Sequence, residues 1–258
     1  IPPELREDSG EIEAAEARAL PALVALADIR GDLHSHTTWS DGKASLEGMV
    51  AAARTRGLEY LAITDHSKSQ TVASGLSEEL LRLHHAAVHE AHAKSKDIAL
   101  LSGTEMDILP DGSLDYPDEA LAELDIVLGA VHSAMDQDRE TMTARVIRAM
   151  RSPHLDIVAH LTTRLIGRRA PVEVDFDAIC KAAVETGTVI EINASTPRLD
   201  LKDTHIRRAR ELGVTFAVST DSHRPEEFAQ MRYGVQQARR GWCEGWRVIN
   251  TLPYPELR

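Results

Sequence analysis

The chain has 258 residues, of which 43% are hydrophobic, and its formal net charge is -12 at pH 7. A chain of this length can bury one sizeable core, and β/α barrels of about this size commonly form a single domain. The negative charge argues against a free-standing, non-specific nucleic-acid binder, because such binding depends on Lys and Arg side chains that neutralise phosphates. An acidic protein can still act on DNA if bound metal ions supply the local positive charge.

The cysteine content and the ends of the chain give further expectations. Cys180 and Cys243 are the only cysteines, so there is no disulfide framework, which is typical of a reducing cytoplasm. No stretch approaches the ~20 apolar residues that span a bilayer, so we expect no membrane contact. We expect residues 1–28 to be a linker and then a helix that follow a missing upstream region, with the domain itself over 29–258. That helix either covers the bottom of the domain or faces the missing region.

Short apolar runs alternate with amphipathic stretches along the chain. The predicted strands lie in RGDLHSHT, LEYLAITDH, IALLSGTEMDIL, DIVLGAVH, LDIVAHL, TVIEINAS and VTFAVSTDSH, which are apolar enough to be buried on both faces. The predicted helices cover residues 45–56, 78–96, 117–124, 138–151, 175–187, 203–213 and 226–240. Ser77 is an expected helix N-cap, and Gly57, Gly187 and Gly213 stand at expected helix ends. The pattern predicts seven β/α units and a parallel sheet.

Polar side chains follow nearly every predicted strand. They are His34, His36, Asp65, His66, Glu105, His132, His160, Asn193, Asp221 and His223. A doubly wound sheet collects its site at a switch point between two strands, whereas a barrel brings the carboxyl ends of all its strands to one face. Contributions from seven strands therefore favour a barrel of the α/β class.

The six histidines in this set, together with Asp41, Glu105 and Asp221, make nine groups that can bind metal. Residues two apart in a strand point the same way, so His34 and His36 can bind one cation, and Asp221 and His223 repeat this spacing. Imidazole and carboxylate without thiolate suit Mn, Zn or Fe, and Mg less well. We expect two or three divalent ions, with phosphoester hydrolysis as the natural task of such a cluster.

These residues also match a known family. The segments DLHSHTTWSDG, ITDHS, GTEMDI, GAVH, DIVAH and STDSH resemble, in this order, the motifs of the PHP (polymerase and histidinol phosphatase) superfamily. The resemblance implies a distorted seven-stranded β/α barrel with a trinuclear site. It implies that one ion is held by His34, His36, Glu105 and Asp221, that Glu105 bridges to a second ion held by His132 and His160, and that the third is held by Asp41, His66 and His223. Leu161 departs from the family, in which Pro often follows the fifth-strand histidine.

The flanking segments narrow the resemblance. IPPELRE, GEIEAA, DHSKSQTVASGLS, RLIGRRAP and INTLP are similar to the carboxyl-terminal PHP domain of bacterial and archaeal family X DNA polymerases. The resemblance implies a 3'-5' exonuclease that uses Mn²⁺ and processes 3' ends, gaps and abasic sites in DNA repair. It also implies DNA and the upstream polymerase domains as partners. The alternatives are a phosphatase of the histidinol-phosphatase type and a non-catalytic module that stabilises a polymerase.

Several residues near the expected metals are candidates for substrate binding. Arg164, Arg168 and Arg169 follow His160, and the arginine fork donates two hydrogen bonds to a phosphate. We expect Arg168 or Arg169 to hold the phosphate while metal-bound hydroxide attacks phosphorus in line. Asp221 and His223 are also expected to be catalytic. The alternative for the three arginines is that they belong to an ordinary surface loop and do not contact the substrate. Lys68 and Asn193 are further candidates, and Trp39 either packs against a nucleotide or covers its loop.

The remaining histidines are expected to be structural. His84, His85, His89 and His92 lie on one predicted helix, and the last three share a face. They could imitate a zinc site. We expect a solvated face instead, because no carboxylate geometry accompanies them.

Overall fold

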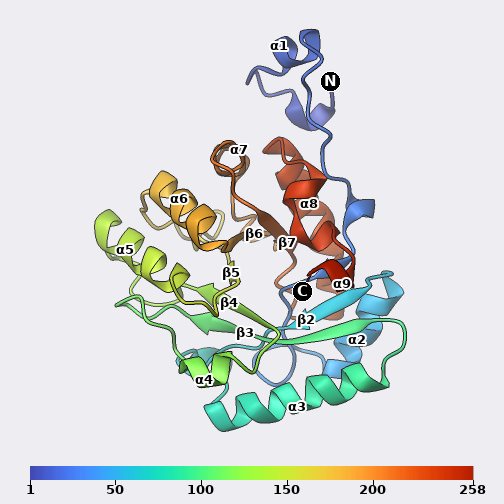
Figure 1. The fold of residues 1–258 in the computed structure, drawn as a ribbon, viewed down its shortest axis with the longest axis vertical. Coiled ribbons are helices and arrows are strands. Elements are labelled where there is room, and N and C mark those ends of the chain that lie inside the picture. The colour runs from blue at the N-terminus through green and yellow to red at the C-terminus, as the bar shows by residue number, and fades with distance from the viewer. Residues whose placement is uncertain (258) are drawn as a thin grey trace.

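The structure, a computed structural model, describes residues 1–257 and is an α/β barrel of seven parallel strands (Figure 1). The strands are β1 (Gly31–Asp32), β2 (Tyr60–Ile63), β3 (Ala99–Asp107), β4 (Ile126–Ala130), β5 (Ile157–Val158), β6 (Val189–Asn193) and β7 (Phe216–Ser219). Each strand pairs in parallel with the next one along the chain, from β1 to β7. The predicted barrel is confirmed.

Helices lie outside the strands, one after each of the seven (Figure 1). They are α2 (Leu46–Thr55), α3 (Glu78–Lys94), α4 (Asp118–Leu121), α5 (Arg139–Met150), α6 (Phe176–Thr186), α7 (Asp203–Glu211) and α8 (Met231–Arg240). The Ser77 side chain accepts from the Leu80 N–H and caps α3, and Gly187 ends α6 with a φ of 78°. Among the described residues no helix combines the length and the apolar character needed to cross a membrane.

The barrel is nearly closed between β7 and β1, and two different contacts join these two edge strands. Toward the carboxyl end, Ser35 and Ser222 form a parallel bridge. Toward the amino end, the Asn250 side chain forms main-chain hydrogen bonds with both β1 and β7, as a strand between them would. Its Nδ2 donates to the carbonyls of Gly31 and Val218 at 2.8 and 2.7 Å, and its Oδ1 accepts from the Val218 N–H at 3.0 Å. One buried amide therefore pairs main-chain groups that would otherwise be unsatisfied.

We expect Asn250→Ala to lower the free energy of unfolding by about 3 kcal/mol, because it removes three hydrogen bonds and leaves buried polar groups unpaired. For a chain of this length each kcal/mol shifts Tm by ~2–4 °C, so a melting curve should show a loss of roughly 10 °C. Thr251→Ala, at the neighbouring position, is the control. A Tm for Asn250→Ala no lower than that of this control would show that the amide does not hold the barrel closed.

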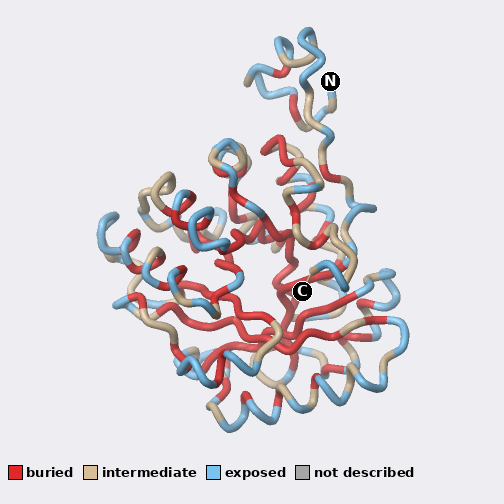
Figure 2. The backbone as a smooth tube through the Cα atoms, in the orientation of Figure 1, coloured by how far each residue is buried: buried red, intermediate tan, exposed pale blue. Residues whose placement is uncertain are grey.

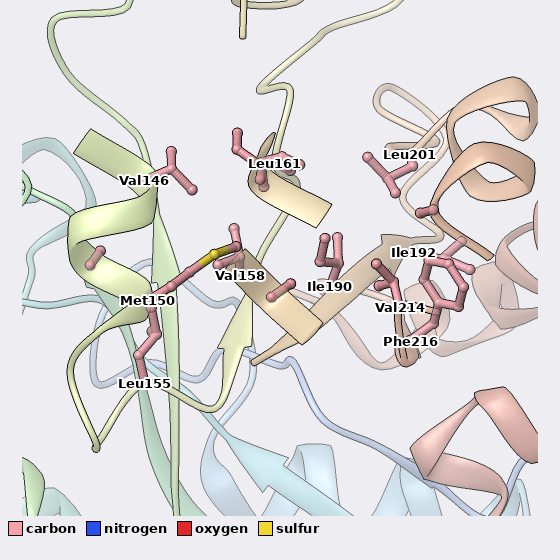
Figure 3. Packing of buried hydrophobic residues seen from close by; sticks show 14 of the residues in the cluster. Val146, Met150, Leu155, Val158, Leu161, Ile190, Ile192, Leu201, Val214 and Phe216 are labelled. Atoms are coloured by element: carbon pink, nitrogen blue, oxygen red, sulfur yellow. The ribbon is translucent and has the colours of Figure 1, made fainter. Parts of the chain in front are cut away.

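Two apolar layers flank the strands. The inward-facing layer fills the barrel and consists of Leu33, Tyr60, Ala62, Leu101, Ile126, Leu128, Ala130, Ile157, Ala159, Val189 and Ala217. The outward-facing layer packs against the helices. Figure 3 shows Val146 and Met150 of α5 beside Val158 of β5, and Ile190 and Phe216 continue this layer along β6 and β7. Both layers are buried along the strands (Figure 2), so the barrel has no open lumen.

Of the two positions expected for the amino-terminal helix, the one beneath the barrel is not observed (Figure 1), and the other stays a prediction. The helix α1 (Glu11–Glu16) of the amino-terminal segment is only six residues long and stands away from the barrel, largely exposed (Figures 1 and 2). Arg18 has a φ of 56°, and Pro21 cannot continue a helix, so the helix ends early. Glu4 ties the segment to α8 through Arg239 at 2.7 Å. The boundary at residue 28 stays a prediction.

Candidate metal centre

The inward-facing rows of the strands change from apolar to ionisable at their carboxyl ends. On β4 the row that includes Ala130 continues to His132, and on β6 Val189 is followed two residues later by Glu191. On β3 the row runs from Leu101 to Glu105. The apolar filling of the barrel is therefore the floor of a polar site.

Four predicted ligands meet around one point at this end. Asp221 Oδ1 lies 3.7 Å from His34 Nε2 and 3.3 Å from His36 Nε2. Glu105 Oε2 lies 3.4 and 3.5 Å from the same two nitrogens. Separations of this size between donor atoms are those of ligands that share an ion with bonds of about 2.0–2.2 Å. The prediction that His34 and His36 face the same point is confirmed.

The other carboxylate oxygen of Glu105 faces a second group. Its Oε1 lies 3.2 Å from His132 Nε2 and 2.7 Å from His160 Nε2. His160 has a positive φ of 27°, which breaks the alternation of the strand and turns the ring toward Glu105. The next residue, Leu161, is buried in the outward-facing layer (Figure 3), so the departure from Pro leaves the ligand in place.

The third group lies at the more exposed edge. Asp41 Oδ1 is 3.6 Å from His66 Nε2 and 3.2 Å from His223 Nε2. Gly42 is required here, because a Cβ at this position would lie 2.6 Å from the Thr37 nitrogen. All nine predicted ligands therefore belong to one cluster, although the division of ligands among ions stays a prediction.

The described atoms fit divalent cations. Three sets of ligand atoms lie within 4.8 Å of one another: His36, Asp41, His66 and His223; His34, His36 and Asp221; and His66, Glu105 and His132. Five of these residues bury atoms with no hydrogen-bond partner, namely His34 Nε2, His36 Nε2, Asp41 Oδ1, His66 Nδ1 and Glu105 Oε2. Buried polar groups are rarely left unpaired, so a cation between them accounts for their arrangement.

The charges hold two members of the cluster in forms that bind metal, whereas neighbouring carboxylates outweigh burial and raise the pKa of the His34, His132 and His223 imidazoles. Burial raises the pKa of Glu105, but the surrounding histidines, His66 first, outweigh it and hold that pKa well below its usual range. Burial and the neighbouring His223 and His66 lower the pKa of His36 to about 4. An ionised carboxylate and a neutral imidazole are the forms that bind metal.

Comparisons with known proteins agree with this geometry. The model of the PHP domain family matches residues 32–195, which is more than half of the chain. The chain belongs to the PHP domain family. This is a family of metal-dependent phosphoesterases, so the predicted family and the coarse chemistry are confirmed.

Individual relatives within the PHP family have names that refer to different enzyme activities. The chain is 44% identical over 251 residues to the DNA polymerase/3'-5' exonuclease PolX of Bacillus subtilis; the match covers 97% of this chain and 44% of PolX. The chain thus spans less than half the length of that relative. It is 28% identical over 232 residues to a probable phosphatase of Thermoanaerobacter sp.. This match covers 85% of this chain and 89% of that phosphatase.

A solved PHP-type structure supports the fold. Histidinol phosphate phosphatase from Lactococcus lactis, complexed with zinc, L-histidinol and phosphate, superimposes with a TM-score of 0.62 at 16% identity. The match covers 82% of this chain and 93% of that one. At this identity the likeness establishes the barrel and leaves the substrate open.

Sequence reasoning missed two acidic residues that orient the PHP ligands. Glu191 accepts from His34 Nδ1 at 2.7 Å, and Asp107 accepts from His132 Nδ1 at 2.5 Å. Each bond directs the Nε2 of its histidine toward the cluster, which is how carboxylates commonly position metal-binding histidines. For Glu191 the missed signal was an acidic residue between the apolar residues of β6.

A third acidic residue, Asp65, holds the loop that carries Asp41. Its carboxylate accepts from the N–H and hydroxyl groups of Thr37 and Ser40, at 2.6 to 3.1 Å. His84 Nε2 donates to it at 3.1 Å. Burial raises the pKa of Asp65, but these hydrogen bonds and nearby positive charges, His84 first, outweigh it and lower that pKa to about 2.

The solvated face predicted for the α3 histidines is therefore wrong for His84, which is fully buried. The helix turns His84 inward because it lies one turn from the buried Leu81 and Val88. His85 contacts the Ser102 hydroxyl at 3.0 Å, and His92 accepts from a main-chain N–H at 3.0 Å. Neither reaches the metal cluster.

We expect His84→Ala to weaken Mn²⁺ binding at the Asp41 position about tenfold, as is typical when a group that positions a metal ligand is lost. Equilibrium dialysis followed by elemental analysis measures this affinity. His84→Gln should recover most of it, because the Gln amide can replace Nε2 as the donor. His89→Ala on the same helix is the control, and equal affinities in His84→Ala and His89→Ala would contradict the assigned role.

The predicted substrate arginines have different surroundings. Arg164 donates to the carbonyls of Arg198 and Leu199, and Arg169 donates twice to the Thr163 carbonyl. Their guanidinium groups therefore hold the loop and have fewer donors to offer a phosphate. Arg168 is exposed. Substrate binding by these three residues stays a prediction.

The other substrate candidates also have defined contacts. Lys68 forms an ion pair with Glu78 at 2.9 Å. Asn193 is buried and donates to Glu191 and Asp221 at 3.0 and 3.2 Å, so it orients ligands. Trp39 lies edge-on to His84 with the ring centroids 5.6 Å apart, which places it against α3.

Arg198, which sequence reasoning missed, is the arginine best placed over the PHP cluster. Its Nε lies 3.6 Å from Asp221 Oδ2, and its side chain is 17% exposed. Its Nη1 is buried without a hydrogen-bond partner. A cation with an unused donor beside the metal ligands suits a phosphoryl oxygen.

Proposed function

We propose that this chain is a metal-dependent phosphodiesterase that removes nucleotides from DNA 3' ends, as the 3'-5' exonuclease domain of a family X DNA polymerase. The observation that carries the proposal is the 44% identity to PolX over 97% of this chain. The nine metal-binding residues are all present in one cluster, which supports catalysis rather than a purely structural role.

The metal ligands, the acidic residues behind them and Arg198 have different roles in the proposed hydrolysis. Divalent ions, with Mn²⁺ the expected activator, would polarise the phosphodiester and activate the attacking water. The Glu105 and Asp221 carboxylates would hold the ions, and Glu191 and Asp107 keep the histidine rings aligned. Arg198 would bind a non-bridging oxygen and stabilise the charge that develops on it.

A small-molecule phosphatase is the second candidate, because relatives called probable phosphatases match 85% of this chain. A third candidate, a non-catalytic module that stabilises a polymerase, predicts damaged ligands, and the cluster here is intact. Partnership with DNA and with polymerase domains, a role in DNA repair and a cytoplasmic location belong to the proposal, and the two buried free cysteines fit a reducing compartment.

The test is to incubate the protein and Mn²⁺ with a 3'-recessed DNA duplex and, separately, with histidinol phosphate. We expect nucleoside 5'-monophosphates to be released from the duplex and little phosphate from histidinol phosphate. The reverse preference would establish the phosphatase. Turnover of neither substrate by metal-loaded protein would favour the non-catalytic module.

A further inference from the structure

Cations are distributed unevenly around the mouth of the barrel. The loops after β3 and β4, residues 108–117 and 131–138, contain four aspartates and no Lys or Arg. The loops after β5, β6, β7 and β1 each contain at least one cation near the metal ligands, whereas the one cation of the loop after β2, Lys68, is paired with Glu78 at 2.9 Å. Arg168, Arg198, Arg224 and Lys43, one from each loop, are called the cationic arc below. In a chain with a net charge of -12, this concentration on one side of the site requires a reason.

The four loops are neighbours in space. β5, β6 and β7 are adjacent in the sheet (Figure 1), and the Ser35–Ser222 bridge places β1 beside β7. Strands lie about 4.8 Å apart, so four neighbouring strands extend over roughly 15 Å. That length exceeds one phosphoryl group and suits a chain of phosphates.

Lys43 and Arg224 form one end of the arc. The Lys43 N–H donates to the His223 carbonyl at 2.7 Å, and Arg224 is the next residue, so the backbone of Lys43 lies beside that of Arg224. Both are exposed, and within residues 1–257 neither side chain forms an ion pair. The nearby Glu227 carboxylate is bound to the main-chain N–H groups of His223 and Arg224. Neither cation is neutralised by an ion pair, so both remain available to attract an anion.

The other end of the arc connects with the metal site. Arg168 is exposed on the loop after His160, and that loop is fixed to the loop of Arg198 by the Ile166 N–H, which donates to the Pro197 carbonyl at 2.7 Å. Arg198 reaches Asp221 at the cluster. The cationic arc therefore extends from the metal ligands to Arg168 on one side and to Arg224 and Lys43 on the other.

We propose that the part of the cationic arc from Arg198 through Arg224 to Lys43 binds the backbone phosphates of a polynucleotide strand whose 3' end occupies the metal site, with the strand leaving over β7 and β1. The inference rests on the proposed function and adds the path of the substrate. A small phosphomonoester contacts Arg198 alone, so Lys43 and Arg224 distinguish a polynucleotide from a small substrate.

The test uses the whole chain with Mn²⁺ and the double variant Lys43→Gln/Arg224→Gln. The two probes are a 20-nucleotide oligothymidylate and bis(p-nitrophenyl) phosphate. For the oligonucleotide we expect kcat/KM at 100 mM salt to fall about tenfold or more, and the slope of log kcat/KM against log salt to become shallower by roughly 1.4, which corresponds to two lost contacts with a single strand. For the small diester we expect a change of less than about twofold, with an unaltered metal content.

Arg151→Gln/Lys181→Gln is the matched control, because it removes one exposed Arg and one exposed Lys from the outside of the barrel. An oligonucleotide rate and salt slope equal to those of this control would overturn the inference. Equal losses on both probes would also overturn it, because they would show damage to the metal site. If the wild-type protein cleaves the small diester but no oligonucleotide, the proposed function itself fails.

Discussion

Glu105→Gln should abolish metal-dependent hydrolysis, with kcat/KM reduced about 10³-fold or more and at least one metal ion lost per chain. The Glu105 carboxylate stands between five histidines: Oε2 faces His34, His36 and His66, and Oε1 faces His132 and His160. The amide has no charge to share between two cations. A loss of about 4 kcal/mol of transition-state stabilisation corresponds to this rate effect.

The measurement is kcat/KM for a 3'-recessed duplex together with elemental analysis of the dialysed protein. Glu59→Gln is the control, because this carboxylate pairs with Arg30 at the surface. Circular dichroism should show that both variants keep the barrel. Wild-type rates in a folded Glu105→Gln protein would show that the cluster is not the reactive centre.

Arg198→Gln should reduce kcat/KM by about 10²-fold to 10³-fold on any phosphoester while the metal content stays constant. The reason is that its buried, unpartnered Nη1 is the donor available to a phosphoryl oxygen beside Asp221. Removing one donor that stabilises developing charge typically has this effect. Arg198→Lys should recover only part of the rate, because an ammonium cannot reproduce the planar fork.

Metal content separates this role from damage to the site. Steady-state kinetics on the duplex and on bis(p-nitrophenyl) phosphate should show parallel losses, and Arg82→Gln on the exposed side of α3 should behave as wild type. If Arg198→Gln loses bound metal, Arg198 acts by holding Asp221 in place. If it keeps both its metal and its activity, Arg198 does not bind the phosphate.

The residues that sequence reasoning placed correctly are those whose position follows from local periodicity. His34 and His36 are two apart in extended chain and therefore face the same point, even though β1 itself covers only Gly31–Asp32. His132 and Glu105 stand at strand ends, and parallel strands in a barrel end on one face. Periodicity and topology do not account for all nine ligands, because the His160 ring is directed by a positive φ and Asp41 lies in a loop.

The residues that it missed depend on contacts between distant segments. The His84–Asp65 bond joins a helix to a loop 19 residues earlier, and the Asn250 amide closes strands more than 30 residues away. Glu191 within an apolar strand is a partner for His34 only when closure of the barrel brings β6 within two strands of β1. Helical periodicity could have shown that His84 lies on the inner face of α3, but not what it meets there.

Anomalous diffraction at the manganese edge, from crystals of the protein grown with Mn²⁺, tests the central claim most directly. We expect two or three anomalous peaks inside the cluster, one of them between Glu105 and Asp221 and one beside Asp41. An anomalous map without any peak among these nine residues, in crystals of active protein, would contradict the assignment of this face as a metal-dependent phosphoesterase centre.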